Sequence, residues 1–540
     1  MKNILVIILF SVILDPVLTN AQVTQEWVAT YNGTGSGAYY AKKNAVDKFG
    51  NLIVCGKSDN ASIDYMVLKY NSSGALLWSQ IYDGTANSSD QLADMILDDS
   101  GNVYVTGSSN EGAANGYFNW LTIKYSPDGV MRWKKSLDWT MHKEDVPYSI
   151  TLDKNGNVYV AGYGWAPGGL QNFDMILAKY NNEGIEQWVR AYDSNPPGHA
   201  DWGYSVVCDD SACSYISGYS YSSNVITIKY DESGNQVWLR EYPRLNAEYP
   251  IPLFSEIDQH GNVIVNGYYQ VAGQSNFVTL KYDRSGIQLW DRVFDSPVGT
   301  IDFVYDIFID DSSNVYIAGS TQGQATFHDI LLIKYSQYGD TIWIRTYDDG
   351  IGEADIAYSL YVDHNQNVYV TGKTYTLNKN DDFITLKFNS NGDIIWNKKY
   401  SLPNTNISYS IALDMYDNVF ISGYTDLSLS ESMAVSIKYS QLTGMEINNN
   451  QTAEEYYIKN YPNPFNPKTE IRYNLGTAGS VSLKVFDTNG KTVKDIINGK
   501  QNSGQHTVEF DGNELPSGVY FCALIVNGVN IQITKMVLLK

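Results

Sequence analysis

The sequence contains little cysteine, little histidine and little positive charge. Four cysteines among 540 residues are too few for a disulfide framework. Six scattered histidines, without an HExxH pattern or a Gly-x-Ser-x-Gly elbow, give no zinc-protease or serine-hydrolase signature. Lys and Arg number 37 against 59 Asp and Glu, a net charge of −22, and an acidic surface would repel the phosphates of nucleic acid. We therefore expect no catalytic constellation of these classes, no cofactor and no nucleic-acid partner.

Long apolar runs are also lacking, except at the N-terminus. Residues 4–14 form an apolar run that follows Lys2 and is too short to span a bilayer. Residues 19–21 supply small side chains for cleavage, so residues 1–21 are predicted to be a secretory signal peptide. Because no other segment is long and apolar enough to span a membrane, we expect a secreted or surface-held product.

What the sequence has in abundance is one repeat, of which residues 152–192 are a representative copy. Three landmarks recur in it: an Asp-x8-Gly spacing, a Lys-aromatic pair and a tryptophan. The aspartate and glycine occur together at Asp47/Gly56, Asp98/Gly107, Asp153/Gly162, Asp209/Gly218, Asp258/Gly267, Asp310/Gly319, Asp363/Gly372 and Asp414/Gly423. The tryptophans are Trp27, Trp78, Trp133, Trp188, Trp238, Trp290, Trp343 and Trp396. A period near 50 residues, built from short apolar segments, predicts a propeller or solenoid.

Four strands are expected in each repeat, because apolar residues alternate with a period of two. In the representative copy they cover residues 148–152, 157–161, 175–180 and 185–192. Four strands per unit are typical of a propeller blade. Trp27 belongs to a fourth strand that no other strand precedes, and the last repeat loses its fourth strand after Tyr439. We therefore predict an all-β fold with an eight-bladed β-propeller over residues 22–444, its N-terminal strand closing the last blade and removing an open edge.

The repeat stops after Gly444, and the remaining chain has a different pattern. Residues 445–460 are polar and predicted to be a linker. Residues 461–540 combine alternating apolar residues with Gly/Pro punctuation, which predicts a small immunoglobulin-like β-sandwich.

Residues spread over this C-terminal segment carry a family resemblance. They include a YPNPFNP run, an SGVYF strand and a basic last strand, with Tyr461, Pro462, Asn463, Pro464, Phe465, Gly518, Tyr520, Lys535 and Lys540 as matching positions. The segment resembles the type A sorting domain of the type IX secretion system of the Bacteroidetes and their relatives. The resemblance implies export to the periplasm and then recognition by the outer-membrane machinery. That machinery would release the cargo or attach it to surface lipopolysaccharide.

The repeats carry a second resemblance, best seen in residues 98–107, DDSGNVYVTG. They are similar to the bacterial seven-bladed β-propeller repeats, the SBBP family, which has no single activity to transfer. The count of landmarks here is eight, in conflict with the family's name, and we base the blade prediction on the count.

Candidate ligand-binding residues lie in the segments that vary between repeats, because loops over a rigid scaffold commonly carry function. One set is acidic and precedes the first strand of most repeats: Asp90, Asp145, Asp201, Asp302 and Asp355, with Asn406 in the eighth. These carboxylates are predicted either to bind a cation or sugar hydroxyls, or to accept backbone hydrogen bonds in their own loops. A second set is aromatic and includes Trp165, Trp202, Tyr219 and Tyr268. Its rings suit saccharide or peptide contacts, and equally suit packing beneath loops.

The invariant residues favour structural roles. The repeated Asp-x-x-Gly-Asn turns are better explained by turn formation than by calcium, so no metal site is predicted. The repeated lysine is expected to pair with the repeated aspartate, and the tryptophan to pack between blades. Cys208 and Cys213 flank one turn, and two alternatives stand for them: a disulfide across the hairpin, or two unpaired buried thiols.

These observations favour a secreted or cell-surface propeller that binds a glycan or protein ligand through its variable loops, without catalysis. Two alternatives remain: an extracellular polysaccharide-degrading glycosidase or lyase that uses carboxylates at the channel mouth, and a structural surface-layer component.

Overall fold

The computed structural model describes residues 23–441 and 457–540, with gaps at 34–36, 61, 85–88, 111–116, 141–142, 168–171, 195–198, 221–223, 244–253, 272–273, 297–301, 323–326, 351–352, 377–379, 429, 476–477, 488–491 and 527–528. The predicted signal peptide and most of the predicted linker lie outside the described residues. Within them, no helix is long and apolar enough to cross a membrane. Two compact units are present, residues 1–441 and 442–540.

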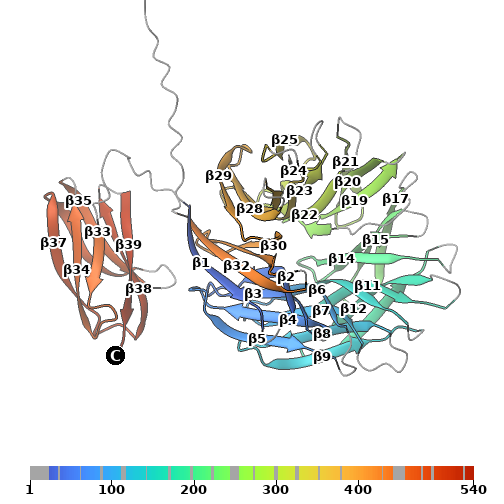
Figure 1. Cartoon of the computed structure of the whole chain (residues 1–540), viewed down its shortest axis with the longest axis horizontal. Helices are drawn as coiled ribbons and strands as arrows, with labels where there is room; N and C mark the ends of the chain where they lie inside the picture. Colours follow the sequence, from blue (N-terminus) through green and yellow to red (C-terminus); the bar gives the residue numbers. More distant parts are fainter. Residues whose placement is uncertain are drawn as a thin grey trace, which may run out of the picture. The chain divides into compact units, whose positions relative to one another are not determined.

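The first unit is an all-β propeller, as predicted from the sequence (Figure 1). Its described strands group into four-stranded antiparallel blades, and in all of them but the last the strands run in chain order from the inner to the outer strand. The first strands are β2 (Ala38–Val46), β6 (Gln91–Leu97), β10 (Val146–Leu152), β14 (Trp202–Cys208), β18 (Phe254–Ile257), β22 (Phe303–Ile309), β26 (Ile356–Val362) and β30 (Asn406–Leu413). The second strands are β3 (Leu52–Asp59), β7 (Val103–Ser109), β11 (Val158–Trp165), β15 (Ser214–Tyr219), β19 (Val263–Val271), β23 (Val315–Thr321), β27 (Val368–Tyr375) and β31 (Val419–Asp426).

The third and fourth strands complete the blades. The third strands are β4 (Ile63–Tyr70), β8 (Asn119–Tyr125), β12 (Phe173–Tyr180), β16 (Val225–Tyr230), β20 (Gln274–Tyr282), β24 (Asp329–Tyr335), β28 (Asp381–Phe388) and β32 (Ser432–Gln441). The fourth strands are β5 (Leu76–Tyr82), β9 (Met131–Leu137), β13 (Glu186–Tyr192), β17 (Gln236–Tyr242), β21 (Gln288–Phe294), β25 (Thr341–Tyr347), β29 (Ile394–Tyr400) and, from the other end of the chain, β1 (Val23–Tyr31). We number the blades 1 to 8 by their first strands, β2 to β30.

The first strands are innermost, and each contacts the first strands of the two neighbouring blades. This series of contacts includes β30 with β2, so blade 8 lies beside blade 1. A single bridge between Ala38 and Ser432 joins the two blades into one hydrogen-bonded sheet. The side chains that pack between blades are mostly alternating Val, Ile, Leu and Tyr of the second and third strands.

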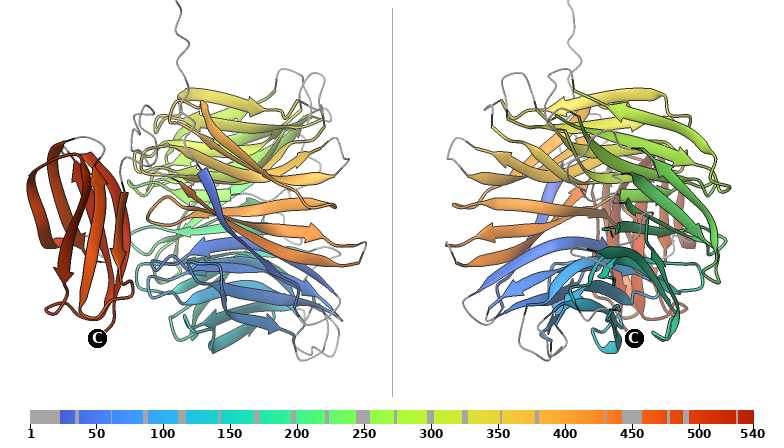
Figure 2. Two further views of the ribbon diagram at one scale, coloured as in Figure 1. Left: turned by 60° about the vertical axis from the view of Figure 1, so that its left-hand side comes forward. Right: turned by 90° about the vertical axis from the view of Figure 1, so that its right-hand side faces the viewer.

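The N-terminal strand β1 pairs antiparallel with β32 of the last blade, with Trp27 opposite Lys438. In the left view of Figure 2 the blue β1 lies among the orange strands of blade 8. Trp27 donates its indole N–H to the carbonyl oxygen of Ser72 in blade 1, at 3.1 Å. Trp78 makes the same contact one blade further on, with the carbonyl of Pro127 at 2.9 Å. The N-terminal strand thus occupies the fourth place in blade 8.

In seven of the eight blades the tryptophan docks on the turn between the third and fourth strands of the next blade. Trp396 instead donates to the Gln441 side chain at the end of β32. Among the seven, Trp188 donates to the carbonyl of Glu232, and Lys179 from the same blade donates to that oxygen as well, at 2.9 Å. The glycine of that turn, Gly234, has a φ of +80°, and a Cβ there would lie 2.8 Å from the Trp188 ring. A side chain would clash with the indole and would also be strained at positive φ. This docking explains why Lys, Gly and Trp recur together.

The predicted pairing of the repeated lysine with the repeated aspartate is confirmed in three repeats, by Lys69–Asp47, Lys229–Asp209 and Lys281–Asp258. In other repeats the lysine has a different partner, such as Gln366 for Lys334. The Lys69–Asp47 and Lys281–Asp258 ion pairs measure 3.0 and 2.8 Å, and all four side chains are buried. The aspartate also caps its own turn. Asp47 accepts hydrogen bonds from the backbone N–H of Asn51 and, with its second oxygen, from the Asn51 side chain, both at 2.9 Å.

The glycine of the Asp-x8-Gly motif faces a β-bulge in the first strand. A Cβ on Gly56 would lie 1.8 Å from the carbonyl oxygen of Tyr40, which no side chain can accommodate. The register of β2 against β3 shifts at the same point, between Ala41 and Lys43, leaving Lys42 as the extra residue. Bulges re-aim side chains. In most blades the bulge residue lies on the innermost strand.

The second unit is a two-sheet sandwich with its own core. One sheet contains β33 (Tyr457–Tyr461), β34 (Lys468–Leu475) and β37 (Gly504–Asp511). The other contains β36 (Thr492–Gln501), β35 (Gly479–Phe486), β38 (Gly518–Val526) and β39 (Val529–Leu538). Apolar residues from both sheets, such as Ile471 and Leu483, are fully buried between them.

Candidate functional site

The predicted acidic residues lie at the start of the first strands, and their side chains are buried. Asp90, Asp201 and Asp302 have no exposed surface, and Asp145 and Asp355 have 2%. Each carboxylate accepts a backbone hydrogen bond from the chain that leaves the preceding blade. The donors are the N–H groups of Gly84, Trp139, Ser194, Ser296 and Asp349, at 2.6–3.0 Å. These carboxylates fasten the connection between consecutive blades.

Asn406 occupies the same place in blade 8 but donates rather than accepts. Its amide nitrogen donates to the carbonyl oxygens of Leu402 and Asn404. Burial raises the pKa of Asp355 to about 6, against the lowering effect of its hydrogen bonds. Burial also raises the pKa of Asp90 and of Asp302. Because an amide serves in one blade and carboxylates in the others, the shared role of this position is to hold the loop.

The predicted aromatic residues Trp165 and Trp202 meet across blades 3 and 4. Both rings pack on Phe173, at centroid distances of 4.7 and 6.2 Å. Lys143 lies over the Trp165 ring at 4.1 Å. The indoles are half-buried and stand at the loop end of their strands. We call Trp165, Phe173 and Trp202, with the adjoining Tyr148, Tyr163 and Tyr204, the blade 3–4 cluster. Tyr219 is buried beneath it, 6.0 Å from Tyr204, and the side chain of Tyr268 lies outside the described residues.

A second group of aromatic residues follows the innermost strands of blades 6, 7, 8 and 1, and we call it the tyrosine arc. Ring centroids are 5.1 Å apart for Tyr305 and Tyr358, 5.0 Å for Tyr358 and Tyr409, and 6.0 Å for Tyr409 and Tyr424. Tyr424 in turn lies 4.6 Å from Tyr40 of blade 1. All five rings are half-buried.

The tyrosine arc is not evident from the repeat landmarks. Three of its members, Tyr305, Tyr358 and Tyr409, are bulge residues. The available signal was a recurring tyrosine followed by a small or acidic residue at a fixed distance before the Asp-x8-Gly motif. A regular alternation would have assigned these positions to the opposite face of the strand.

A charged group lies along the axis of the propeller. Lys43 of blade 1 forms an ion pair with Asp94 of blade 2. Asp94 also accepts the backbone N–H of Ile150 in blade 3, at 3.0 Å, and Asp306 accepts that of Leu360 in blade 7, at 2.9 Å. Enclosure by the surrounding blades raises the pKa of Glu256 to about 7, and the charge of Asp306 adds to this effect. These polar side chains link the innermost strands to one another.

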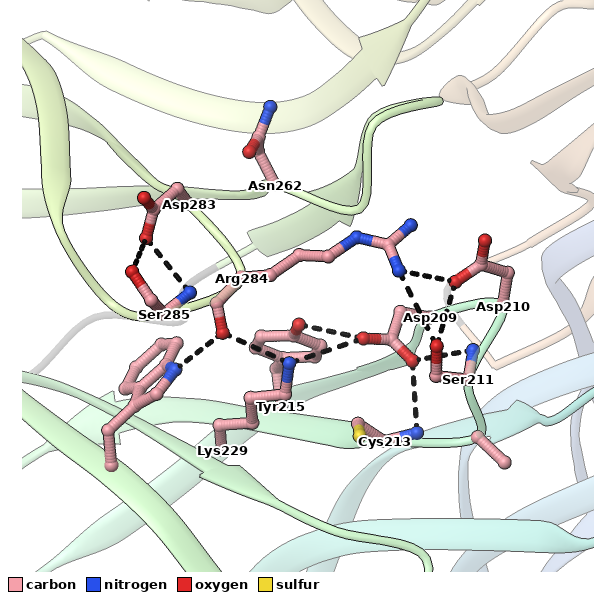
Figure 3. A network of polar contacts seen from close by, with 12 residues as sticks. Asp209, Asp210, Ser211, Cys213, Tyr215, Lys229, Asn262, Asp283, Arg284 and Ser285 are labelled. Carbon is pink, nitrogen blue, oxygen red and sulfur yellow. Dashed lines mark hydrogen bonds and ion pairs between the residues drawn. The ribbon is translucent and has the colours of Figure 1, made fainter.

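A cavity of about 310 Å³ opens near Glu256, at the end of the propeller opposite the variable loops. Its walls come from the first strands and turns of blades 3 to 5 and include Thr151, Asp209, Gln259 and Arg284. Figure 3 shows that Arg284 reaches across from blade 5 to the turn of blade 4. Its guanidinium pairs with Asp210 at 2.8 Å and donates to the carbonyl of His260 at 2.6 Å. The arginine is therefore engaged in joining two turns.

The disulfide alternative for Cys208 and Cys213 is wrong, because both thiols are unpaired. Cys208 stands opposite Ser214 in the hairpin, so Cys213 belongs to the other face of the sheet. Accordingly, Cys208 packs toward blade 3 with Tyr159, and Cys213 packs toward blade 5 with Trp238. Burial raises the pKa of both thiols.

The predicted sorting residues separate into exposed and buried groups. Tyr461, Pro462, Asn463 and Pro464 are exposed, whereas Phe465 and Tyr520 belong to the core of the sandwich. The N–H and carbonyl of Phe465 bond to Val537 and Leu539 of the last strand region, at 2.8 and 2.9 Å.

The basic end of the chain is joined to the turn before β38. Lys540 donates its backbone N–H to Ser517 and its ammonium group to the carbonyl of Asn513. Gly518 opens β38, and the side chain of Lys535 lies outside the described residues.

Comparison with known families agrees with both resemblances. Residues 459–540 match the secretion system C-terminal sorting domain, and residues 78–112 and 142–169 match the beta-propeller repeat. The chain is also 22% identical over 456 residues to an uncharacterized WD repeat-containing protein of Acanthamoeba polyphaga mimivirus. That match covers 67% of this chain and 31% of the viral protein, so the chain spans about a third of its length.

Similar solved structures are more distant in sequence. PorZ, a surface component of the type IX secretion system of Porphyromonas gingivalis, is 13% identical with a TM-score of 0.40, over 92% of this chain and 70% of PorZ. The β-propeller domain of the Trilobed protease from Pyrococcus furiosus is 10% identical with a TM-score of 0.40, over 66% and 99%. A polysaccharide lyase, Uly1, is 8% identical with a TM-score of 0.38, over 77% and 92%.

Proposed function

Because the chain carries a type IX sorting domain after its β-propeller repeats, we propose that it is an exported, non-catalytic binding propeller that presents its variable-loop end to a glycan or protein ligand. The sorting domain directs export to the cell surface or the extracellular space. The observation that carries the binding proposal is the blade 3–4 cluster, in which Trp165 and Trp202 converge on Phe173 at the loop end. Half-exposed indoles beside polar groups are common in sites for sugars and peptides.

The hydrogen bonding of the acidic residues supports binding rather than catalysis. A catalytic carboxylate must reach the reacting atoms of its substrate. Asp201 and Asp302 are fully buried, and both hold the backbone of their own loops. Thr321 donates a further hydrogen bond to Asp302, at 2.6 Å. These carboxylates are occupied within the protein.

A second candidate function is polysaccharide cleavage, and one observation favours it. Burial raises the pKa of Asp355 to about 6. A carboxylic acid that is partly protonated near neutral pH is what a glycosidase requires as its general acid.

The test is to screen the full chain on a glycan array and to measure turnover of every polysaccharide it binds. We expect binding without turnover, and at least a roughly tenfold loss of affinity in Trp165→Ala and Trp202→Ala, because stacking aromatics dominate such contacts. Phe49→Ala is the matched control, since Phe49 is 68% exposed but stands on a turn at the opposite end of the propeller. Turnover that Asp355→Asn abolishes would establish the enzyme instead. A silent array, together with no captured protein ligand, would reject the binding proposal.

A further inference from the structure

Two lysines beside the tyrosine arc have no acidic partner in the described structure. Lys42 is the bulge residue of β2, and its ammonium nitrogen lies 4.9 Å from the centroid of Tyr409. Lys57 comes from the neighbouring strand β3 and lies 4.6 Å from the centroid of Tyr40. Lys42 is exposed and Lys57 half-buried. Both cations therefore sit against aromatic faces and remain accessible.

Other lysines of the propeller have polar partners. Lys124 and Lys334 also lie over tyrosine rings, but they donate hydrogen bonds to Asn182 and Gln366. Lys69 and Lys281 are each neutralised by the aspartate of their own repeat. Lys373 occupies in blade 7 the place that Lys57 has in blade 1, and it is paired with Asp381 at 3.0 Å. Asp426, on the adjoining strand of blade 8, accepts a hydrogen bond from Ser432. No ion pair of Lys42 or Lys57 with an acidic group occurs among the described residues.

The two lysines also act on one another. Partial desolvation of its ammonium group by the neighbouring side chains, and then the charge of Lys57, lowers the pKa of Lys42, although much of the residue is exposed. Two like charges held together against aromatic rings are unfavourable unless an anion joins them. In a chain with a net charge of −22, a pair of uncompensated cations is a local exception, and charge complementarity selects an anionic group at this point.

The surroundings of the lysines indicate what carries the anionic group. Tyr305, Tyr358 and Tyr409 place a row of half-exposed rings along the innermost strands of three consecutive blades, at intervals of 5.1 and 5.0 Å. Flat apolar faces that also carry hydroxyl groups suit the two sides of pyranose rings, and a row of them suits several sugars in sequence.

We propose that the tyrosine arc, together with Lys42 and Lys57, binds an acidic oligosaccharide whose carboxylate lies between the two ammonium groups. The proposal rests on the binding function proposed above and specifies the class of its glycan. The lysines hold the charged group by charge-assisted hydrogen bonds, and the tyrosines stack on the sugars that follow it.

The test is calorimetric titration of the full chain with a hexamer of galacturonic acid, and with the same hexamer after its carboxyl groups have been reduced. We expect binding of the acidic hexamer, at least about tenfold weaker binding of the reduced one, and weakening by salt. The double variant Lys42→Gln/Lys57→Gln should lose affinity about tenfold or more, and Lys42→Arg/Lys57→Arg should retain most of it. Lys48→Gln is the matched control, because it removes the same charge from an exposed position on a turn at the other end. Thermal melting checks that each variant is folded.

Four results would overturn the proposal. The first is equal affinity of the acidic hexamer for the wild-type chain and the double glutamine variant. The second is preference for the reduced hexamer, which would leave a neutral-glycan binding function intact. The third is tighter binding of an oligo-aspartate peptide, which would assign the lysines to an acidic protein ligand. Loss of hexamer binding in Trp165→Ala but not in Tyr409→Ala would place a glycan at the blade 3–4 cluster and also reject this site.

Discussion

At the scale of single residues, a tryptophan that docks on a turn of the next blade limits which residue can occupy that turn. The Trp78 ring fills the space over Gly129, where a Cβ would lie 2.7 Å from the indole and φ is +80°. Gly50 has a similar φ of +75°, but its nearest atom would be 3.8 Å away. Substitutions at the two glycines can therefore be compared: both introduce backbone strain, but only the one at Gly129 also disturbs the docked indole.

We expect Gly50→Ala to destabilise the propeller by about 1–2 kcal/mol, the cost of a side chain in the left-handed region. Gly129→Ala should cost a further 1–3 kcal/mol, roughly, because the methyl group displaces the indole. Urea unfolding followed by tryptophan fluorescence measures both. Equal midpoints for the two variants would show that Trp78 does not depend on close contact with Gly129.

A buried aspartate makes the stability of the propeller depend on pH. Asp174 is 8% exposed, and burial, followed by the charge of Asp193, raises its pKa to about 6 from an ordinary value of 3.8. Because the folded chain binds this proton more tightly than the unfolded chain, this group destabilises the fold above pH 6. The penalty fades as the pH falls through 6 toward 4.

Asn119 and Asn276 occupy the corresponding positions of other repeats, so Asp174→Asn should be tolerated. At pH 7.5 it should stabilise the propeller by about 1–3 kcal/mol, with the gain vanishing near pH 4. Asp99→Asn, at an exposed turn, removes the same charge and should show no such pH dependence. Thermal melting of both variants across this pH range tests the prediction. A stability gain of Asp174→Asn that persists at pH 4 would contradict the raised pKa of Asp174.

At the scale of elements, β1 is exceptional. Among the described strands of the propeller, it is the only one that completes a blade whose other strands are distant in the sequence. Deleting residues 23–31 would expose the edge of β32 and remove the Trp27 ring from Gly74. We expect the melting temperature to fall by about 10 °C. A synthetic peptide of the same nine residues should restore part of the loss. Unchanged melting after the deletion would mean that blade 8 is stable with three strands.

The same elements show how far sequence reasoning reaches. Repeat landmarks predicted the blades and the place of Trp27, because spacing and periodicity reflect local hydrogen bonding and packing. Lys42 and three tyrosines of the arc were missed because they are bulge residues. A bulge turns the inserted residue to the face of the strand opposite to the one that regular alternation predicts. The sequence left a disulfide and two unpaired thiols as alternatives for Cys208 and Cys213 for a related reason: proximity along a hairpin does not say which face each residue occupies. A site assembled from several blades can be predicted only when the face of the strand on which each side chain lies is known.

At the scale of the whole molecule, the chain divides into a propeller and a sandwich with separate cores. The exposed YPNP segment and the basic terminal strand both belong to the sandwich, which has a hydrophobic core of its own.

Removing residues 459–540 should therefore leave the melting temperature of the propeller unchanged. In a type IX-competent bacterium the truncated chain should accumulate in the periplasm. Fractionation and immunoblotting test this, with Phe49→Ala in the full chain as the exported control. Truncated protein in the medium would show that a second signal lies elsewhere.

The pairing of β1 with β32 has a consequence for biosynthesis. The ribosome makes Trp27 more than 400 residues before its partner strand. Throughout that interval the N-terminal strand carries unsatisfied hydrogen-bonding groups, and so does the growing end of the array, which makes the nascent protein prone to association with other chains. Chaperones that hold extended chains are therefore expected to matter most for this protein before its last repeat is complete, and little afterwards.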